Sequence, residues 1–303
     1  MTMPLHPAAA QILEMMKQLP STAAPFSVEA FRLGDAQPLP FPKMEVAEVR
    51  DLVLAGTPAR LYHPRPGEAL PVVFFLHGGG WVCGSIETHD VTCRALAAKA
   101  GVAVISLDYP RAPENPFPAP LEASYRALQA LGDAVPSIDT GRIAVAGDSA
   151  GGNLAAALCL LTKERGGRAI AHQLLIYPVT DTDFTRESYR ANGADYFLTA
   201  PMMHWFWEQY VGDAVANPPS LAAPLRATDL SGLPSATIIT AEYDPLRDEG
   251  EAYAARLKAA GVPVRLERVA GVFHGFASMP GVLPPADAAL DLAAADLRRA
   301  FHM

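Results

Sequence analysis

Short apolar runs of strand length alternate along most of the chain with segments rich in Ala and Leu. The apolar runs read PVVFFL, VAVISL, RIAVAG, HQLLIY, ATIIT and PVRLERV. Strands buried on both faces carry such continuous runs, and their alternation with helices is typical of a parallel sheet. Before them, MEVAEVRDLVL alternates apolar and polar residues and is expected to pair with TPARLYH across Gly56. The pattern predicts an α/β fold with a mostly parallel central sheet flanked by helices.

Two segments stand outside this alternation and are expected to cover the sheet. Residues 8–19 have helical spacing, and Ser27 is placed to cap a second short helix. Residues 180–226 contain an aromatic segment and a Pro-rich stretch, and an insertion of that length between two strands usually has a function. The expected parts are an N-terminal helical cap over 1–43, a cap insertion over 180–226, and a core over 44–179 and 227–303.

Composition and charge limit the partners of the chain. The net charge is −8 and no basic stripe is present, which argues against a nucleic-acid partner. No apolar run approaches the roughly 18 residues of a membrane span, and a signal peptide is not expected. The odd count of cysteines (Cys83, Cys93, Cys159) favours free thiols in the cytoplasm, with a Cys83–Cys93 bridge as the alternative. They match no metal-ligand spacing, so no metal is expected.

The stretch Gly147-Asp148-Ser149-Ala150-Gly151 follows an apolar run and precedes a helical segment. A G-x-S-x-G sequence in this context is typical of a sharp turn that holds a nucleophilic serine in strained backbone geometry. The alternatives are a small-residue packing turn or a phosphate cradle, although the absence of G-K-[S/T] excludes a P-loop. Ser149 is therefore the predicted nucleophile, standing exposed above the sheet at a helix N-terminus that favours negative charge.

The stretch HGGGW at residues 77–81 directly follows another apolar run. Three consecutive glycines are costly in conformational entropy, and acyl transfer gives a reason for them, because its oxyanion needs preorganised N–H donors. The predicted donors are Gly78 and Gly79, with Ala150 as the third. His77 is interpreted as a structural histidine of the loop. Trp81 either lines the substrate pocket or packs the loop.

A catalytic histidine is expected downstream of the serine, since the order in this fold class is Ser, then Asp or Glu, then His. The downstream histidines are His172, His204, His274 and His302. His274 follows the last apolar run on a glycine-flanked loop, whereas the others lie in a strand, in the insertion or at the terminus. His274 is therefore the predicted base.

The acid that orients this histidine is expected to be Asp244, which follows the run ATIIT. Pro245 biases Asp244 to an extended conformation that lets it project from the strand end. Asp181 and Asp183, after the preceding strand, remain the alternatives. The next two acidic residues, Asp248 and Glu249, lie inside the following helix and suit a supporting role.

An apolar substrate pocket is expected near the insertion. Met202, Met203 and Phe206 share helical spacing there, and flexible methionines suit a permissive acyl site. Tyr177, at the end of the strand before the insertion, is a further candidate. Ordinary core packing of a cap helix is the alternative explanation for each of them.

Together these segments make the chain resemble the bacterial hormone-sensitive-lipase family of carboxylesterases, which have an α/β-hydrolase fold. The matching segments read HGGGW, DYPRAPENPFPAPLEA, GDSAGGN, DPLRDEG and HGF. The resemblance implies a triad of Ser149, Asp244 and His274 and oxyanion donors at Gly78, Gly79 and Ala150. It also implies short- to medium-chain acyl ester substrates, no cofactor, and a homodimer formed through the sheet edge. One departure is that Pro110 and Arg111 replace the family's usual R-L, so no ion-pair role of that arginine is carried over.

The predicted reaction is ester hydrolysis through a covalent acyl-enzyme. An amidase, a lactonase or an acyltransferase would use the same triad. A non-catalytic receptor of the same fold, as in the plant gibberellin receptor, is the remaining alternative, but such receptors lack the triad histidine.

Overall fold

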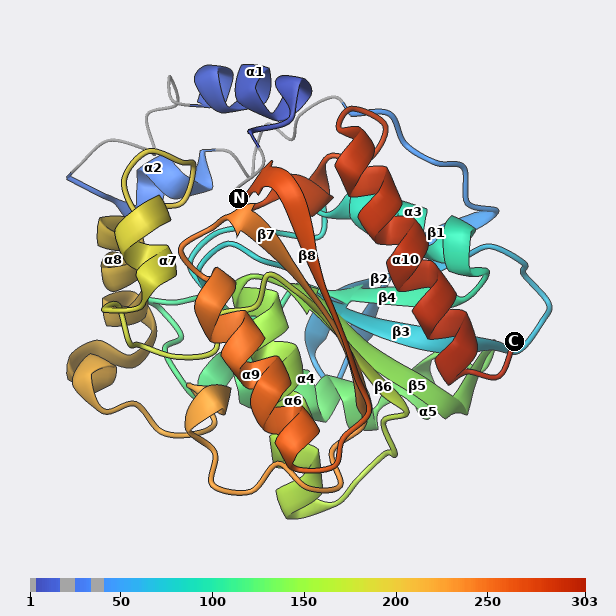
Figure 1. Cartoon of the computed structure of the whole chain (residues 1–303). Coiled ribbons are helices and arrows are strands. Elements are labelled where there is room, and N and C mark those ends of the chain that lie inside the picture. The colour runs from blue at the N-terminus through green and yellow to red at the C-terminus, as the bar shows by residue number, and fades with distance from the viewer. Residues whose placement is uncertain (1–3, 17–24, 34–40) are drawn as a thin grey trace.

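The structure, a computed structural model, describes residues 4–16, 25–33 and 41–303. Within these residues one sheet has eight strands in the order β1-β2-β4-β3-β5-β6-β7-β8 (Figure 1). Strand β2 is antiparallel to β1 and β4, and the remaining pairs are parallel. The strands are β1 (Glu48–Leu54), β2 (Thr57–His63), β3 (Leu70–Leu76), β4 (Ala103–Leu107), β5 (Ile138–Asp148), β6 (His172–Ile176), β7 (Ser235–Tyr243) and β8 (Val264–Phe273). The predicted α/β fold is confirmed.

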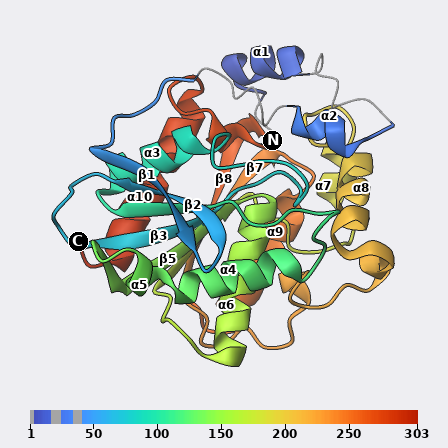
Figure 2. The same ribbon diagram turned by 180° about the vertical axis from the view of Figure 1, so that it is seen from behind.

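Helices cover both faces of this sheet, as Figures 1 and 2 show from opposite sides. The α-helices of the described residues are α1 (Pro7–Met16), α2 (Val28–Arg32), α3 (Asp90–Ala100), α4 (Ala119–Gln129), α5 (Leu131–Ala134), α6 (Ala150–Arg165), α7 (Glu187–Asn192), α8 (Ala200–Val211), α9 (Arg247–Ala259) and α10 (Pro284–Ala300). Short 3-10 helices are η2 (Gly212–Ala216), η3 (Pro224–Arg226) and η4 (Phe276–Ser278). None of the helices among the described residues combines the length and apolarity that crossing a bilayer requires.

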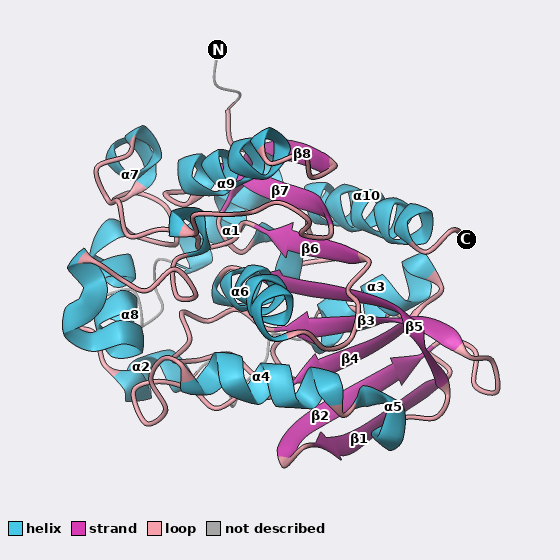
Figure 3. Cartoon of the chain, turned by 90° about the horizontal axis from the view of Figure 1, so that it is seen from below, coloured by secondary structure: helices cyan, strands magenta, loops and turns pink. Residues whose placement is uncertain are grey.

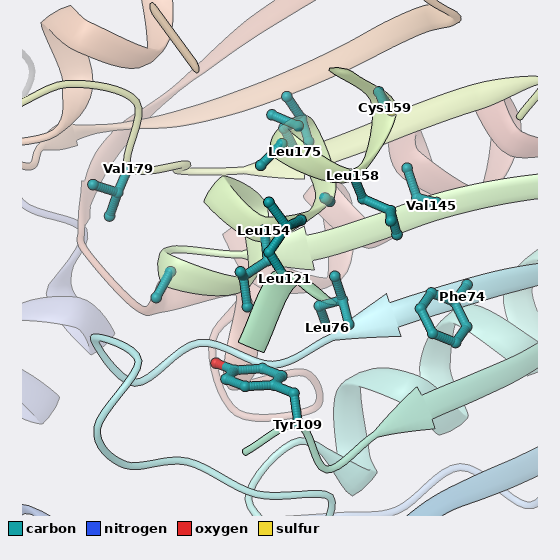
Figure 4. Packing of buried hydrophobic residues seen from close by; sticks show 14 of the residues in the cluster. Phe74, Leu76, Tyr109, Leu121, Val145, Leu154, Leu158, Cys159, Leu175 and Val179 are labelled. Carbon is teal, nitrogen blue, oxygen red and sulfur yellow. The ribbon is translucent and has the colours of Figure 1, made fainter. Parts of the chain in front are cut away.

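Two hydrophobic cores lie on the two faces of the sheet. One contains α4, α6, α8 and α9, and the other contains α1, α3 and α10. In the first, Leu154 and Leu158 of α6 lie over Val145 and Leu175 of the sheet (Figure 4). All seven residues of β3 are buried. The central strands are therefore covered on both sides, which explains their continuous apolar runs.

The hairpin and the helix cap predicted near the N-terminus are both present. Strands β1 and β2 pair from Glu48 opposite His63 to Leu54 opposite Thr57, with Gly56 at φ 84° in the turn. The Ser27 side chain accepts the N–H of Ala30 at 3.1 Å at the start of α2. The first predicted helix is α1, and the residues 17–19 assigned to it lie outside the described part of the chain.

The N-terminal segment and the insertion between β6 and β7 meet over one end of the sheet. Figures 1 and 3 show α2 close to α8. The Phe31 ring of α2 lies 5.1 Å from the Trp205 ring and 4.7 Å from the Phe206 ring of α8, measured between centroids. This contact is consistent with a joint cover made of two distant segments, and the exact boundaries of that cover remain a prediction.

Candidate active site

The structure brings Ser149, Asp244 and His274 together. They follow β5, β7 and β8, and because these strands are parallel their carboxyl ends meet at one edge of the sheet. The His274 Nε2 atom lies 2.9 Å from Ser149 Oγ, and its Nδ1 atom lies 2.7 Å from Asp244 Oδ2. These distances form a continuous hydrogen-bonded relay from hydroxyl to carboxylate. Direct contact thus joins Ser149 to His274, which are 125 positions apart in the sequence, and His274 to Asp244, which are 30 positions apart.

Ser149 occupies a turn so tight that the residues two positions before and after it must lack side chains. Its φ of 54° and ψ of −120° lie outside the regions that L-residues ordinarily adopt. A Cβ atom on Gly151 would collide with the carbonyl oxygen of Leu76, and one on Gly147 with that of Gly151. The expectation that the serine stands exposed was wrong, because Ser149 is only 8% exposed.

Asp244 and His274 are each held by contacts of their own loops. Asp244 is fully buried, and its Oδ1 atom accepts the N–H of Leu246 at 2.8 Å, which leaves Oδ2 for the histidine. The Tyr177 ring packs 4.6 Å from the His274 ring, between centroids. Gly275 at φ 86° turns the chain directly after the histidine. The imidazole therefore lies between a carboxylate, a hydroxyl and an aromatic face.

The alternative acids have other partners. Asp181 is paired with Arg186 at 2.8 Å and with Arg226 at 2.7 Å. Asp183 accepts hydrogen bonds from the backbone and hydroxyl of Thr185. Neither carboxylate contacts the histidine, so the geometry favours Asp244.

Helix α7 of the insertion holds the loop that carries Asp244, and the sequence analysis missed this contact. The Asn192 side-chain amide donates to the carbonyl oxygens of Glu242 and Asp244, each at 3.3 Å. The Ser188 hydroxyl donates to the carbonyl oxygen of Pro245 at 2.6 Å. These two side chains lie one helical turn apart on α7 and face the same loop. No motif marks them, because their partners are backbone carbonyls about 50 residues away.

The prediction of Gly78 as an oxyanion donor needs correction. Its N–H donates to the buried Asp148 carboxylate at 2.9 Å, so it is already engaged. By contrast, no group within the described residues accepts the N–H of Gly79, Gly80 or Ala150. Gly79 and Gly80 have φ values of 116° and 58°, which glycine adopts without strain. The available donors of the loop are therefore the second and third glycines.

His77 is a structural residue of this loop. Its Nδ1 atom donates to the carbonyl oxygen of Gly78 at 2.8 Å, and its ring stacks on Tyr109 with centroids 4.2 Å apart. Burial lowers the pKa of His77 to about 3, so the ring is neutral. The Tyr109 hydroxyl donates to the His77 carbonyl oxygen at 2.7 Å, and Arg111 donates to that of Gly84 at 2.8 Å. Arg111, which stands one position later than the arginine of the family pattern, thus holds the chain just after this loop.

Of the predicted pocket residues, Tyr177 and Phe206 lie against the site. The Phe206 ring is so close to Gly80 that any Cβ there would enter it. Trp81 is fully buried, stacked on Tyr210 with centroids 4.2 Å apart, so it packs the loop and does not line a pocket. Met202 and Met203 are buried in the hydrophobic core that contains α4, α6, α8 and α9.

Other candidate sites show less organisation. A hollow of about 450 Å³ lies beside β1 and β2, where Arg60, Glu87 and Asp108 contribute to its lining, and no triad residue borders it. Cys83, Cys93 and Cys159 are all free, so the alternative of a Cys83–Cys93 bridge was wrong. Among the described residues no group of three or more His, Cys, Asp or Glu side chains is arranged to hold a metal ion.

Comparison with known proteins gives consistent matches. A family model described as the α/β-hydrolase fold matches residues 73–278. Carboxylesterase NlhH of Mycobacterium tuberculosis is 42% identical over 257 residues, which cover 82% of this chain and 80% of that protein. Ethyl acetate hydrolase of Pseudomonas putida is 39% identical over 239 residues, covering 77% and 75%. The solved structure of a hyperthermophilic esterase from the archaeon Pyrobaculum calidifontis matches with a TM-score of 0.92 at 40% identity, covering 98% of this chain and 99% of that one.

Proposed function

The chain belongs to the α/β-hydrolase family of carboxylic ester hydrolases, and from this premise we propose that it hydrolyses short- to medium-chain acyl esters through a Ser149–His274–Asp244 triad. The observation that carries the proposal is the relay itself. Hydroxyl, imidazole and carboxylate are joined by hydrogen bonds of 2.9 and 2.7 Å at the edge of the sheet. The preference for small esters is supported by the relative that is named an ethyl acetate hydrolase.

In the proposed mechanism His274 Nε2 takes the proton of Ser149 Oγ as that oxygen attacks the ester carbonyl. Asp244 holds the imidazole in the tautomer with the proton on Nδ1 and stabilises the imidazolium that forms. The imidazolium then protonates the leaving alcohol, and an acyl-serine remains. Water deprotonated by the same histidine attacks the acyl carbonyl, and the imidazolium returns the proton to Ser149 Oγ as the acid leaves.

We propose that the oxyanion of each tetrahedral intermediate binds the N–H groups of Gly79, Gly80 and Ala150. These are the donors left available in the loop of residues 77–81 (the oxyanion loop) and at the first residue of α6. The N-terminus of α6 adds the favourable end of its dipole. One donor of this kind is worth about 10²–10³ in rate.

The variant Ser149→Ala tests the proposal. We expect it to lower kcat toward p-nitrophenyl butyrate by at least about 10⁴-fold, because the covalent step is lost while the oxyanion donors remain. The melting temperature should stay within about 2 °C of the wild type, since only a single hydroxyl is removed and the backbone of the turn is unchanged.

The matched control is Ser231→Ala, at an exposed serine in the loop that precedes β7, which should retain full activity. If the purified Ser149→Ala protein keeps comparable turnover, the proposed function fails. A series of acyl chain lengths, run beside an amide and a lactone, then defines the substrate range.

A further inference from the structure

Asp148, the residue before the nucleophile, has a buried carboxylate that the mechanism above does not use. It ends β5 and is 6% exposed. Its Oδ1 atom accepts the Gly78 N–H at 2.9 Å. The fit is close, because a Cβ atom on Gly78 would lie 2.5 Å from Asp148 Oδ2. A buried carboxylate is costly unless it is paired, so its presence here calls for a reason.

His89 supplies the pairing. Its Nε2 atom lies 3.1 Å from Asp148 Oδ1 and 3.3 Å from Oδ2, and its Nδ1 atom lies 2.9 Å from the Thr88 hydroxyl. Burial favours the protonated form of Asp148, but the charge and hydrogen bond of His89 and the Gly78 N–H together keep its pKa below the usual value. The carboxylate therefore stays ionised and accepts the loop N–H more strongly than a neutral group would.

The hydrogen bond between Gly78 and Asp148 spans the two halves of the proposed oxyanion hole. Gly78 immediately precedes the donors Gly79 and Gly80, and Asp148 lies two residues before the donor Ala150. The hydroxyl of Tyr109 and the guanidinium of Arg111 anchor the same loop to the segment after β4. Of these anchors, Asp148 alone belongs to the turn of residues 147–151 that carries Ser149. It therefore sets the distance between the two groups of donors.

We propose that Asp148 and His89 are positioning residues that fix the distance between the oxyanion loop and the turn that carries Ser149. This inference rests on the proposed function. Displacing a hydrogen-bond donor by about 1 Å can lower the rate by about 10²-fold. The donors stabilise the charge that develops on the oxyanion, so their displacement raises the energy of the transition state more than that of the bound substrate. Loosening the pair should therefore lower kcat and leave KM nearly unchanged.

The experiment compares two pairs of variants at the two positions. Asp148→Ala removes the acceptor and should lower kcat by about 10²-fold, whereas Asp148→Asn keeps an acceptor oxygen and should lose about tenfold or less. His89→Gln keeps a donor near the Nε2 position and should stay within about threefold of the wild type, while His89→Leu should lose about tenfold. KM should change by less than about threefold throughout.

A trifluoromethyl ketone analogue of the ester supplies a readout that a purely structural role would not move. It adds to the serine and forms a tetrahedral oxyanion, so its inhibition constant should rise by the same factor as kcat falls. Asp229→Asn, at an exposed pair with Lys163, is the control and should change neither quantity.

Three outcomes would overturn the inference. The folded Asp148→Ala variant could keep its kcat, kcat could fall while the affinity for the ketone is unchanged, or His89→Gln could be as impaired as His89→Leu. If Asp148→Ala does not fold, the His89 pair decides alone. Loss of activity in Ser149→Ala together with unaffected Asp148 variants would reject the positioning role and leave the proposed function standing.

Discussion

Three of the five non-glycine residues with positive φ among the described residues lie around the candidate active site. Ser149 at 54°, Trp81 at 62° and Tyr177 at 36° are not glycines, and each immediately follows a strand or loop that borders the site. Such conformations cost about 1–3 kcal/mol each and persist only where the surroundings determine them. Here the surroundings are the buried strand ends and, for Trp81, the aromatic side chains of α8.

Gly80 allows a sharp test at this scale. A Cβ atom there would enter the Phe206 ring at a backbone φ of 58°. Gly80→Ala should therefore displace the loop that carries two of the proposed donors, and kcat should fall by about 10²-fold. Steady-state kinetics with p-nitrophenyl butyrate provides the measurement.

The matched control is Gly212→Ala, because Gly212 has the same φ of 58° and no atom within 4 Å of the added Cβ. It should cost about 1 kcal/mol of stability through backbone strain and leave kcat unchanged. Equal kinetics in the two variants would show that Gly80 is not tied to the reaction.

Single residues could be proposed from the sequence where a motif defined them. The order of the triad and the flanking glycines pointed to Ser149, Asp244 and His274, whose side chains are in contact in the structure, and their catalytic roles stay a prediction. The choice between Gly78 and Gly80 could not be made in that way. It depends on the acceptor of each N–H, and the acceptor of the Gly78 N–H is a side chain 70 residues further along the chain.

At the scale of elements, helix α2 connects the N-terminal segment to the oxyanion loop. Arg32 donates to both carboxylate oxygens of Glu114 at 2.7 Å, to the Val82 carbonyl oxygen at 2.9 Å and to that of Ala112 at 3.0 Å. Its neighbour Phe31 packs on the aromatic side chains of α8. One short helix is thereby fixed to both the core and the insertion.

Arg32→Met should destabilise the protein more than Glu114→Gln does. The first removes every hydrogen bond of the guanidinium, for a loss of about 1–2 kcal/mol, while the second removes only a half-exposed ion pair, for about 0.5 kcal/mol. Urea denaturation of the two variants and of the double variant measures the coupling between them. Equal losses would mean that the carbonyl contacts contribute nothing.

The elements themselves were predictable because apolar periodicity reflects burial, and the buried strands and the helices that cover them carry the strongest pattern. How the cover is attached was not predictable. Asn192, Ser188 and Arg32 act through backbone carbonyls of distant loops, and a carbonyl acceptor leaves no signature in the sequence.

At the scale of the whole molecule, the insertion and the core share a buried carboxylate. Glu249 of α9 is fully buried, and its Oε1 atom accepts the N–H groups of Thr180 at 2.7 Å and Asp181 at 3.2 Å. Burial raises the pKa of Glu249 to about 8 in the folded protein. Global stability should therefore depend on pH in a direction opposite to that of an ordinary surface carboxylate.

Between about pH 4.5 and 8 the folded state keeps the Glu249 proton and the unfolded state loses it, so stability falls as pH rises through this range. Glu249→Gln keeps the acceptor oxygen and cannot ionise. The stability of this variant relative to the wild type should thus increase from pH 5 to pH 8, as measured by urea denaturation at both values. A difference that stays constant with pH would contradict the assignment.

The contact of helix α7 with the loop that carries Asp244 has a consequence for protein engineering. Residues 180–226 could be replaced by the corresponding segment of a homologue in order to change the substrate preference. The exchange would also remove the Asn192 amide and the Ser188 hydroxyl, which donate hydrogen bonds to the Asp244 loop. A chimera that ignores these two groups should lose turnover for every ester alike, and restoring both should recover it. A segment exchanged to alter selectivity must therefore keep Asn192 and Ser188 if the rate is to be preserved.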